Sequence, residues 1–210
     1  MSVTKLLAIS LGAILTNNFI FSQFLGIYPF LGVSKKSDTA IGMGLAVTFV
    51  MGLASAFCYG VNIILVKLGL DYMQTVAFIL VVASLVQFIE MFLKKSMPTL
   101  YTALGVYLPL ITTNCCVLGV TILAVQDYTK VYEAQGFGMA YAEALICAAG
   151  AGVGFLVAML LFCGVRQRVE RSNPPESFKG LPITLVSAAI TAMSFMGFGG
   201  LVENIIAALM

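Results

Sequence analysis

Residues 6–34 read LLAISLGAILTNNFIFSQFLGIYPFLGVS and contain no charged side chain. A helix needs about 20 apolar residues to cross a hydrocarbon core about 30 Å thick, and this run is long enough to do so. Thr16, Asn17 and Asn18 interrupt it near the middle, and Pro29 disfavours helical geometry at the preceding Tyr28. The run therefore predicts a membrane span whose helix is broken inside the bilayer.

A second run with the same ingredients lies in the other half of the chain. Residues 96–126 are uncharged and contain Pro109 followed by the Thr113-Asn114 pair. This run also predicts a broken helix. An unsatisfied backbone group at membrane depth costs several kcal/mol, so such breaks occur where protein or a cavity shields them. The two breaks therefore mark a candidate site.

The rest of the chain has the composition of an integral membrane protein. Hydrophobic residues make up 60% of it and the mean hydropathy is +1.04. The uncharged runs lack the period-2 alternation of barrel strands, which favours an all-α fold. We expect one transmembrane domain over residues 1–210 with six helices, two of them broken. The uncharged runs are 6–34, 39–66, 72–89, 96–126, 144–165 and 180–202. The predicted connections are 34–38, 67–71, 94–98, 126–135 and 166–179.

The positions of the two broken runs indicate an inverted repeat. They lead two halves, about 1–95 and 96–210, and each half has three predicted spans. An odd number of spans gives the halves opposite orientations in the membrane. Two broken helices that meet near the midplane are a layout common in secondary transporters.

Basic residues predict the orientation, because cytoplasmic loops carry the excess of Lys and Arg. Eight of them flank one side of the predicted bundle and three the other, so we expect both termini to be extracytoplasmic. The eight are Lys35, Lys36, Lys94, Lys95, Arg166, Arg168, Arg171 and Lys179, and the three are Lys5, Lys67 and Lys130.

Composition also excludes several function classes. The chain has no His, which removes imidazole metal ligands, His-ligated haem and His-dependent catalytic dyads. Its net charge of +2 provides no basic field for nucleic acid. No nucleotide-binding fingerprint is present, so we expect no NAD, flavin or haem on this chain.

The adjacent pair Cys115-Cys116 is the main candidate for metal chemistry, because thiolates are the ligands of iron–sulfur clusters. The alternative is that both are small residues packed between helices. Two cysteines cannot complete a four-thiolate cluster, so a cluster would require a second subunit.

Other polar residues lie at membrane depth. Glu143 is an intramembrane carboxylate and a candidate for an ion path, and Glu203 is a weaker one. We expect Asn17, Asn18 and Asn114 to hydrogen-bond the interrupted backbone rather than bind ions directly.

Four segments resemble the Rnf-Nqr family of membrane subunits, and within it the A-type subunits of the Rnf complex. They are Thr16–Phe19, Phe24–Lys36, Gln87–Met91 and Leu108–Cys115. The resemblance covers the chain from end to end. It implies a subunit of an oxidoreductase complex that passes electrons between ferredoxin and NAD and moves Na⁺ or H⁺ across the cytoplasmic membrane of a bacterium or archaeon.

The resemblance further implies the partners and the cofactor. The A-type subunit pairs with a homologous E-type subunit of opposite orientation, alongside B, C, D and G subunits, and cysteines from the pair hold a [2Fe–2S] cluster. Cys115, preceded by Thr113 and Asn114, matches one family cysteine, but Tyr28 occupies the position of the other. Tyr28 could supply a phenolate or bond a freed carbonyl, Cys116 could substitute, or the cluster could be altered or missing.

Two other functions fit the same residues. Broken helices also occur in small secondary transporters. Tyr28 at the family's cysteine position is compatible with a structural scaffold that has no cofactor of its own.

Overall fold

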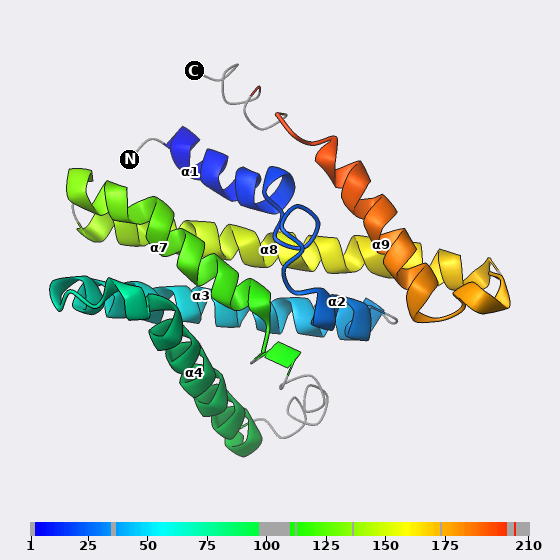
Figure 1. Ribbon diagram of the computed structural model, residues 1–210, viewed down its shortest axis with the longest axis horizontal. Helices are drawn as coiled ribbons and strands as arrows, with labels where there is room; N and C mark the ends of the chain where they lie inside the picture. Colours follow the sequence, from blue (N-terminus) through cyan, green and yellow to red (C-terminus); the bar gives the residue numbers. More distant parts are fainter. Residues whose placement is uncertain are drawn as a thin grey trace.

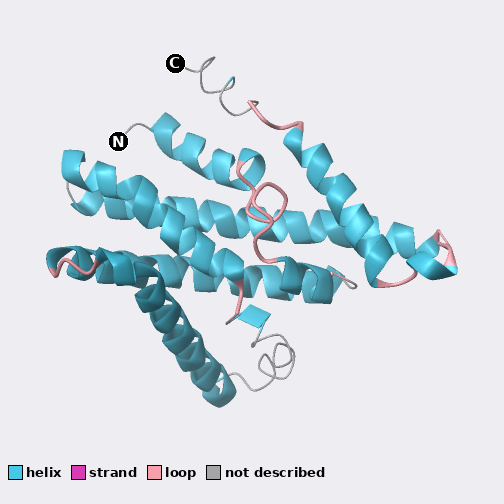
Figure 2. Cartoon of the chain, viewed as in Figure 1, coloured by secondary structure: helices cyan, strands magenta, loops and turns pink. Residues whose placement is uncertain are grey.

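The computed structural model describes residues 3–34, 37–96, 110–111, 113–135, 137–172, 174–200 and 204. Within these residues the chain is helical and contains no strand, which confirms the all-α class (Figures 1 and 2). The α-helices are α1 (Val3–Leu11), α2 (Ile27–Val33), α3 (Ser37–Lys67), α4 (Gln74–Ser96), α7 (Cys115–Gln135), α8 (Phe137–Arg171) and α9 (Leu181–Met196). A π-helical turn, η1 (Gly12–Thr16), follows α1, and the 3-10 turns η2 (Asp71–Met73) and η3 (Glu176–Phe178) precede α4 and α9.

Three of the described helical segments are long and apolar enough to cross a membrane. They are Ser37–Lys67, Asp71–Phe92 and Gly138–Arg171. Leu6–Thr16, Cys115–Gln126 and Leu181–Met196 are apolar but shorter. Each uncharged run overlaps one of these segments. The six-span inverted repeat itself stays a prediction.

Helices α3 and α8 run side by side and form the centre of the molecule (Figure 1). Their close approach depends on small residues, as is common between membrane helices. A Cβ atom built on Gly152 would lie 2.6 Å from Cγ2 of Thr48, and one built on Gly44 would lie 2.3 Å from Cδ1 of Leu156. Helix α8 also contacts α1, α7 and α9, whereas α4 diverges from the bundle (Figure 1).

One predicted connection is wrong. The sequence predicts a loop over residues 126–135, but α7 continues through them to Gln135 and α8 begins at Phe137. Likewise, α8 extends to Arg171 rather than ending at the charged residues that begin at Arg166. A charged residue ends an apolar run but not a helix, because Lys, Arg and Glu are good helix formers.

Candidate functional site

The first break separates η1 from α2 and covers residues 17–26. The backbone N–H of Asn17 closes the π turn by donating to the carbonyl of Gly12 at 2.7 Å. Isolated π turns are often found at functional sites. The chain then re-enters a helix after Gly26, whose φ of 78° is left-handed. The predicted break in the first span is therefore present.

Of the two causes that the sequence suggests for this break, the asparagines lie in it but Pro29 does not. The sequence predicts that Pro29 disturbs the helix at Tyr28, but both residues lie within the first turn of α2. The first backbone N–H groups of a helix have no intrahelical partner, so the missing donor of Pro29 loses nothing there. The interruption lies earlier in the chain, between Asn17 and Gly26.

Asn18 holds the first break together. Its Nδ2 donates to the carbonyls of Ile14 at 3.0 Å and Gly154 on α8 at 2.9 Å. Its Oδ1 accepts from the backbone N–H groups of Ile20 at 3.1 Å and Phe21 at 3.3 Å. The buried amide thus bonds the turn before the break and the backbone within the break, and it joins both to α8. The side chain of Asn17 is exposed and makes no such bond.

The second break has a similar asparagine. Thr113 and Asn114 form a turn directly before α7, and Oδ1 of Asn114 accepts from the backbone N–H of Cys116 at 3.0 Å. This is an N-cap bond for α7. Nδ2 of Asn114 is buried and has no acceptor among the described residues. Pro109, expected to contribute to this break, lies outside the described residues, as does Glu203.

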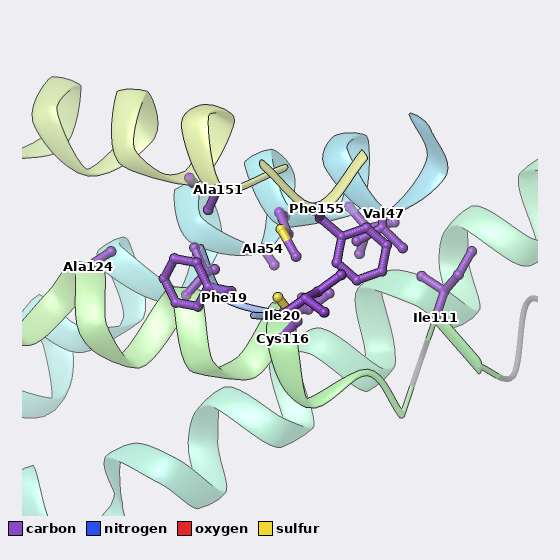
Figure 3. Close-up of a cluster of buried hydrophobic side chains, with 14 of the residues drawn as sticks. Phe19, Ile20, Val47, Ala54, Ile111, Cys116, Ala124, Ala151 and Phe155 are labelled. Carbon is purple, nitrogen blue, oxygen red and sulfur yellow. The ribbon is translucent and has the colours of Figure 1, made fainter. Parts of the chain in front are cut away.

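The two breaks meet at Gly26. A Cβ atom on this glycine would lie 3.0 Å from Oδ1 of Asn114, 3.0 Å from Cβ of Cys116 and 3.1 Å from a ring carbon of Phe155. Figure 3 shows Cys116 beside Ile20 of the first break and Phe155 of α8, within one buried cluster. The chain therefore brings residues about ninety positions apart into contact, as the sequence analysis expected of two broken helices.

The candidate ligands differ in exposure. Cys115 is the first residue of α7 and is exposed, and its thiol lies 4.0 Å from the carbonyl of Thr113. Cys116 is 0% exposed and faces the core. Successive helical residues point about 100° apart, which accounts for the difference. Tyr28 is 78% exposed, two residues beyond Gly26. We call Tyr28 and Cys115 the outward pair.

The outward pair fits one half of a shared metal site. Among the described residues, no group of three or more Cys, Asp, Glu or His could hold a metal ion. This chain presents one exposed thiol and one exposed phenol near the meeting point of the breaks. Substitution by Cys116 would require that thiol to leave the core. The described part of the chain thus offers no complete ligand set of its own.

Helix α2, which carries Tyr28, is fixed to α8 by two contacts that the sequence analysis did not predict. The rings of Phe30 and Phe162 stack with centroids 4.2 Å apart. One turn later on α8, Arg166 donates from Nη1 to the carbonyl of Leu31 and to the hydroxyl of Ser34. In the sequence, Arg166 is only one of the cations that flank a membrane span. Its place directly after an uncharged run was the one available signal.

The remaining candidate, Glu143, is fully buried on α8. Tyr59 and Tyr141, whose ring centroids are 5.8 Å apart, also belong to the α3 and α8 region. A fully buried carboxylate in a membrane helix is a default candidate for an ion path. The ion path stays a prediction.

Comparisons with known proteins identify relatives along nearly the whole chain. Residues 6–202 match the model of the family described as Rnf-Nqr subunit, membrane protein. A similar protein is the A-type subunit of the Na(+)-translocating ferredoxin:NAD(+) oxidoreductase complex of Acetobacterium woodii, 51% identical over 93% of this chain and 97% of that protein. The A-type subunit of the ion-translocating oxidoreductase complex of Syntrophotalea carbinolica is 49% identical over 95% of this chain and 99% of its own. The protein of the same name from Thioalkalivibrio sulfidiphilus is 48% identical over 96% of this chain and 100% of its own length.

Proposed function

Because the chain belongs to the Rnf-Nqr family of membrane subunits, we propose that it is the A-type subunit of an ion-translocating ferredoxin:NAD oxidoreductase complex. Its role there is to hold part of an intramembrane [2Fe–2S] cluster and to help couple electron transfer to the movement of Na⁺ or H⁺. It performs no reaction alone.

The observation that carries this proposal is the contrast in exposure between Cys115 and Cys116 at the meeting point of the two breaks. A packing pair of cysteines would both be covered, whereas here one thiol is exposed and the other is fully buried. An exposed thiol at the start of a membrane helix is available to a second subunit. Cys115 is therefore the ligand that we assign to the cluster.

The position of Cys115 suits a negatively charged ligand. It is the first residue of α7, where the unpaired N–H groups and the helix dipole give a partial positive charge. Asn114 fixes the backbone at this point through its bond to the N–H of Cys116. When bound, a [2Fe–2S] cluster would supply one-electron transfer, and this chain would supply the thiolate of Cys115, with the phenol of Tyr28 nearby as an alternative oxygen ligand.

The missing ligands imply the partner. We propose a homologous six-helix subunit of the E type, in the opposite orientation, that covers the outward pair, with B, C, D and G subunits in the same complex. The chain would lie in a bacterial or archaeal cytoplasmic membrane with both termini extracytoplasmic. Glu143 is the buried carboxylate that we propose for the ion path.

A scaffold without its own cofactor is the second candidate function. Tyr28 favours it, because this chain presents a phenol where a second thiol would complete its half of the site. A small secondary transporter is the third candidate function. Iron content separates it from the cluster-holding subunit, because a transporter would contain no iron.

The test is the paramagnetic-resonance spectrum and the iron content of the purified, reduced complex. We expect a [2Fe–2S] signal that persists in a subcomplex of the A-type and E-type chains. A subcomplex without iron would contradict the cluster role and would favour the scaffold or the transporter.

A further inference from the structure

We propose that Arg166 is a positioning residue that holds the half-helix α2, and with it Tyr28, in place beside the start of α7. The inference rests on the proposed function, because the geometry that it preserves is that of the outward pair. None of the sequence motifs singled out this residue.

Helix α2 cannot hold its own position. It has seven residues, and isolated helices much shorter than about 12 residues are marginal. Its N-terminal end follows an irregular segment, so that end is not continuous with another helix. The carbonyl groups of its last turn need partners from outside the helix.

Arg166 supplies these partners at the C-terminal end of α2. Its Nη1 donates to the carbonyl of Leu31 and, at 2.9 Å, to Oγ of Ser34. The hydroxyl of Thr39 donates to the carbonyl of Val33 at 3.2 Å. The guanidinium is also favourably placed because a positive charge stabilises the negative end of a helix dipole.

The third contact of the guanidinium explains how its charge is balanced. Nε donates to Oε1 of Glu170 on the same helix at 3.0 Å, and that carboxylate is half-exposed. The side chain of Arg166 is only 7% exposed. A buried cation with one partly solvated partner contributes little net stability, so its value lies in fixed geometry.

The anchor lies close to the outward pair. Leu31 is three residues after Tyr28, which is less than one helical turn, or about 4.5 Å along the axis. On α8, Phe162 lies one turn before Arg166, so the ring stack and the guanidinium hold α2 along one stripe. A change at Arg166 therefore tilts or frees the segment that bears Tyr28.

The test uses the complete purified complex and three variants. Arg166→Gln removes the charge and the forked donors. Arg166→Lys retains a charge but cannot reproduce the fork. Arg168→Gln is the matched control, because it makes the same change at an exposed arginine of the same helix.

Two measurements are made on each variant. Hydrogen–deuterium exchange of the peptide covering residues 27–34 reports the anchoring of α2 whether or not a cluster is present. The midpoint potential and g values of the cluster, normalised to assembled complex, report the geometry of the outward pair. If Arg166 had only a structural role, its variants would lower the amount of assembled complex but leave the normalised midpoint potential and g values unchanged.

We expect Arg166→Gln to speed exchange in this peptide roughly tenfold and to shift the midpoint potential, with Arg166→Lys intermediate and Arg168→Gln like the wild type. Unchanged exchange, or faster exchange with an unchanged potential, would overturn the inference. A wild-type complex without any cluster signal instead contradicts the proposed function, and the exchange result is then judged by itself.

Discussion

Each of the two helix breaks contains an asparagine that hydrogen-bonds the backbone. Only the asparagine of the first break uses all of its hydrogen-bonding groups. Asn18 makes four hydrogen bonds to backbone groups, with two donors and two lone pairs in use. Asn114 makes one, from Cys116, and its Nδ2 finds no acceptor in the part of the chain that the structure describes. The first break is therefore stable within this chain, while the second break has spare bonding capacity.

This difference separates a break that is bonded within the chain from one whose amide donor has no acceptor among the described residues. The first break bends the chain so that α2 returns toward α7, and the amide of Asn18 is bonded entirely within this chain. The second break presents an exposed thiol one residue after an incompletely bonded amide. A buried, unsatisfied polar group costs about 1–3 kcal/mol, so the amide donor of Asn114 makes the second break the weaker of the two.

The largest expected effect comes from Asn18→Ala. The change leaves carbonyl and N–H groups unsatisfied before the first break, within it and on α8, and we expect a loss of about 3–5 kcal/mol of stability. Thermal unfolding of the detergent-purified protein measures it. Asn17→Ala is the matched control, since that side chain is exposed, and it should remain within about 0.5 kcal/mol of the wild type. Equal effects of the two variants would contradict the assigned role of Asn18.

Gly26→Ala tests whether the breaks are in contact. The added methyl group would lie 3.0 Å from atoms of Asn114 and Cys116, and the positive φ of Gly26 adds backbone strain. We therefore expect the variant to lose about 2–3 kcal/mol of stability. Gly69→Ala separates the crowding from the backbone strain. Gly69 also has a positive φ, of 67°, but a Cβ atom built on it would meet no other atom within 4 Å. That control should lose only about 1 kcal/mol in the same unfolding assay. Similar losses at both glycines would mean that the crowding at Gly26 is absent.

Asn114→Ala should destabilise the chain alone by about 1 kcal/mol, the typical value of one N-cap. Asn114→Ser keeps a capping oxygen and should restore this loss. Because the amide of Asn114 is buried within the chain, the loss should be the same in the single chain and in the assembled complex. A serine variant that is as unstable as the alanine variant, measured by unfolding, would contradict the capping role.

Changes at Tyr28 should leave stability within about 0.5 kcal/mol, because the side chain is 78% exposed. Tyr28→Cys adds a second thiol to the outward pair, so we expect the midpoint potential and g values of the cluster to shift. Tyr28→Phe is the control for loss of the phenol hydroxyl alone. A spectrum and potential unaffected by Tyr28→Cys would place residue 28 outside the ligand set.

The sequence predicted the helical class and the broken first span because long uncharged runs and mid-span asparagines are local signals. The contribution expected from Pro29 is wrong because proline is harmless in a first helical turn, a position that only the start of α2 defines. The bonds from Asn18 to Gly154 and from Arg166 to Leu31 join residues more than 130 positions apart. No local pattern reveals such contacts. The exposure of Cys115 and burial of Cys116 likewise depend on where α7 begins.

The most direct test of the account compares Cys115→Ala with Cys116→Ala in the purified, reduced complex. The measurement is the intensity of the [2Fe–2S] paramagnetic-resonance signal per assembled complex. We predict that Cys115→Ala abolishes the signal without preventing assembly, and that Cys116→Ala keeps it while losing about 1–2 kcal/mol of stability from the core. A signal that survives Cys115→Ala, or that disappears only with Cys116→Ala, would contradict the assignment of Cys115 as the ligand.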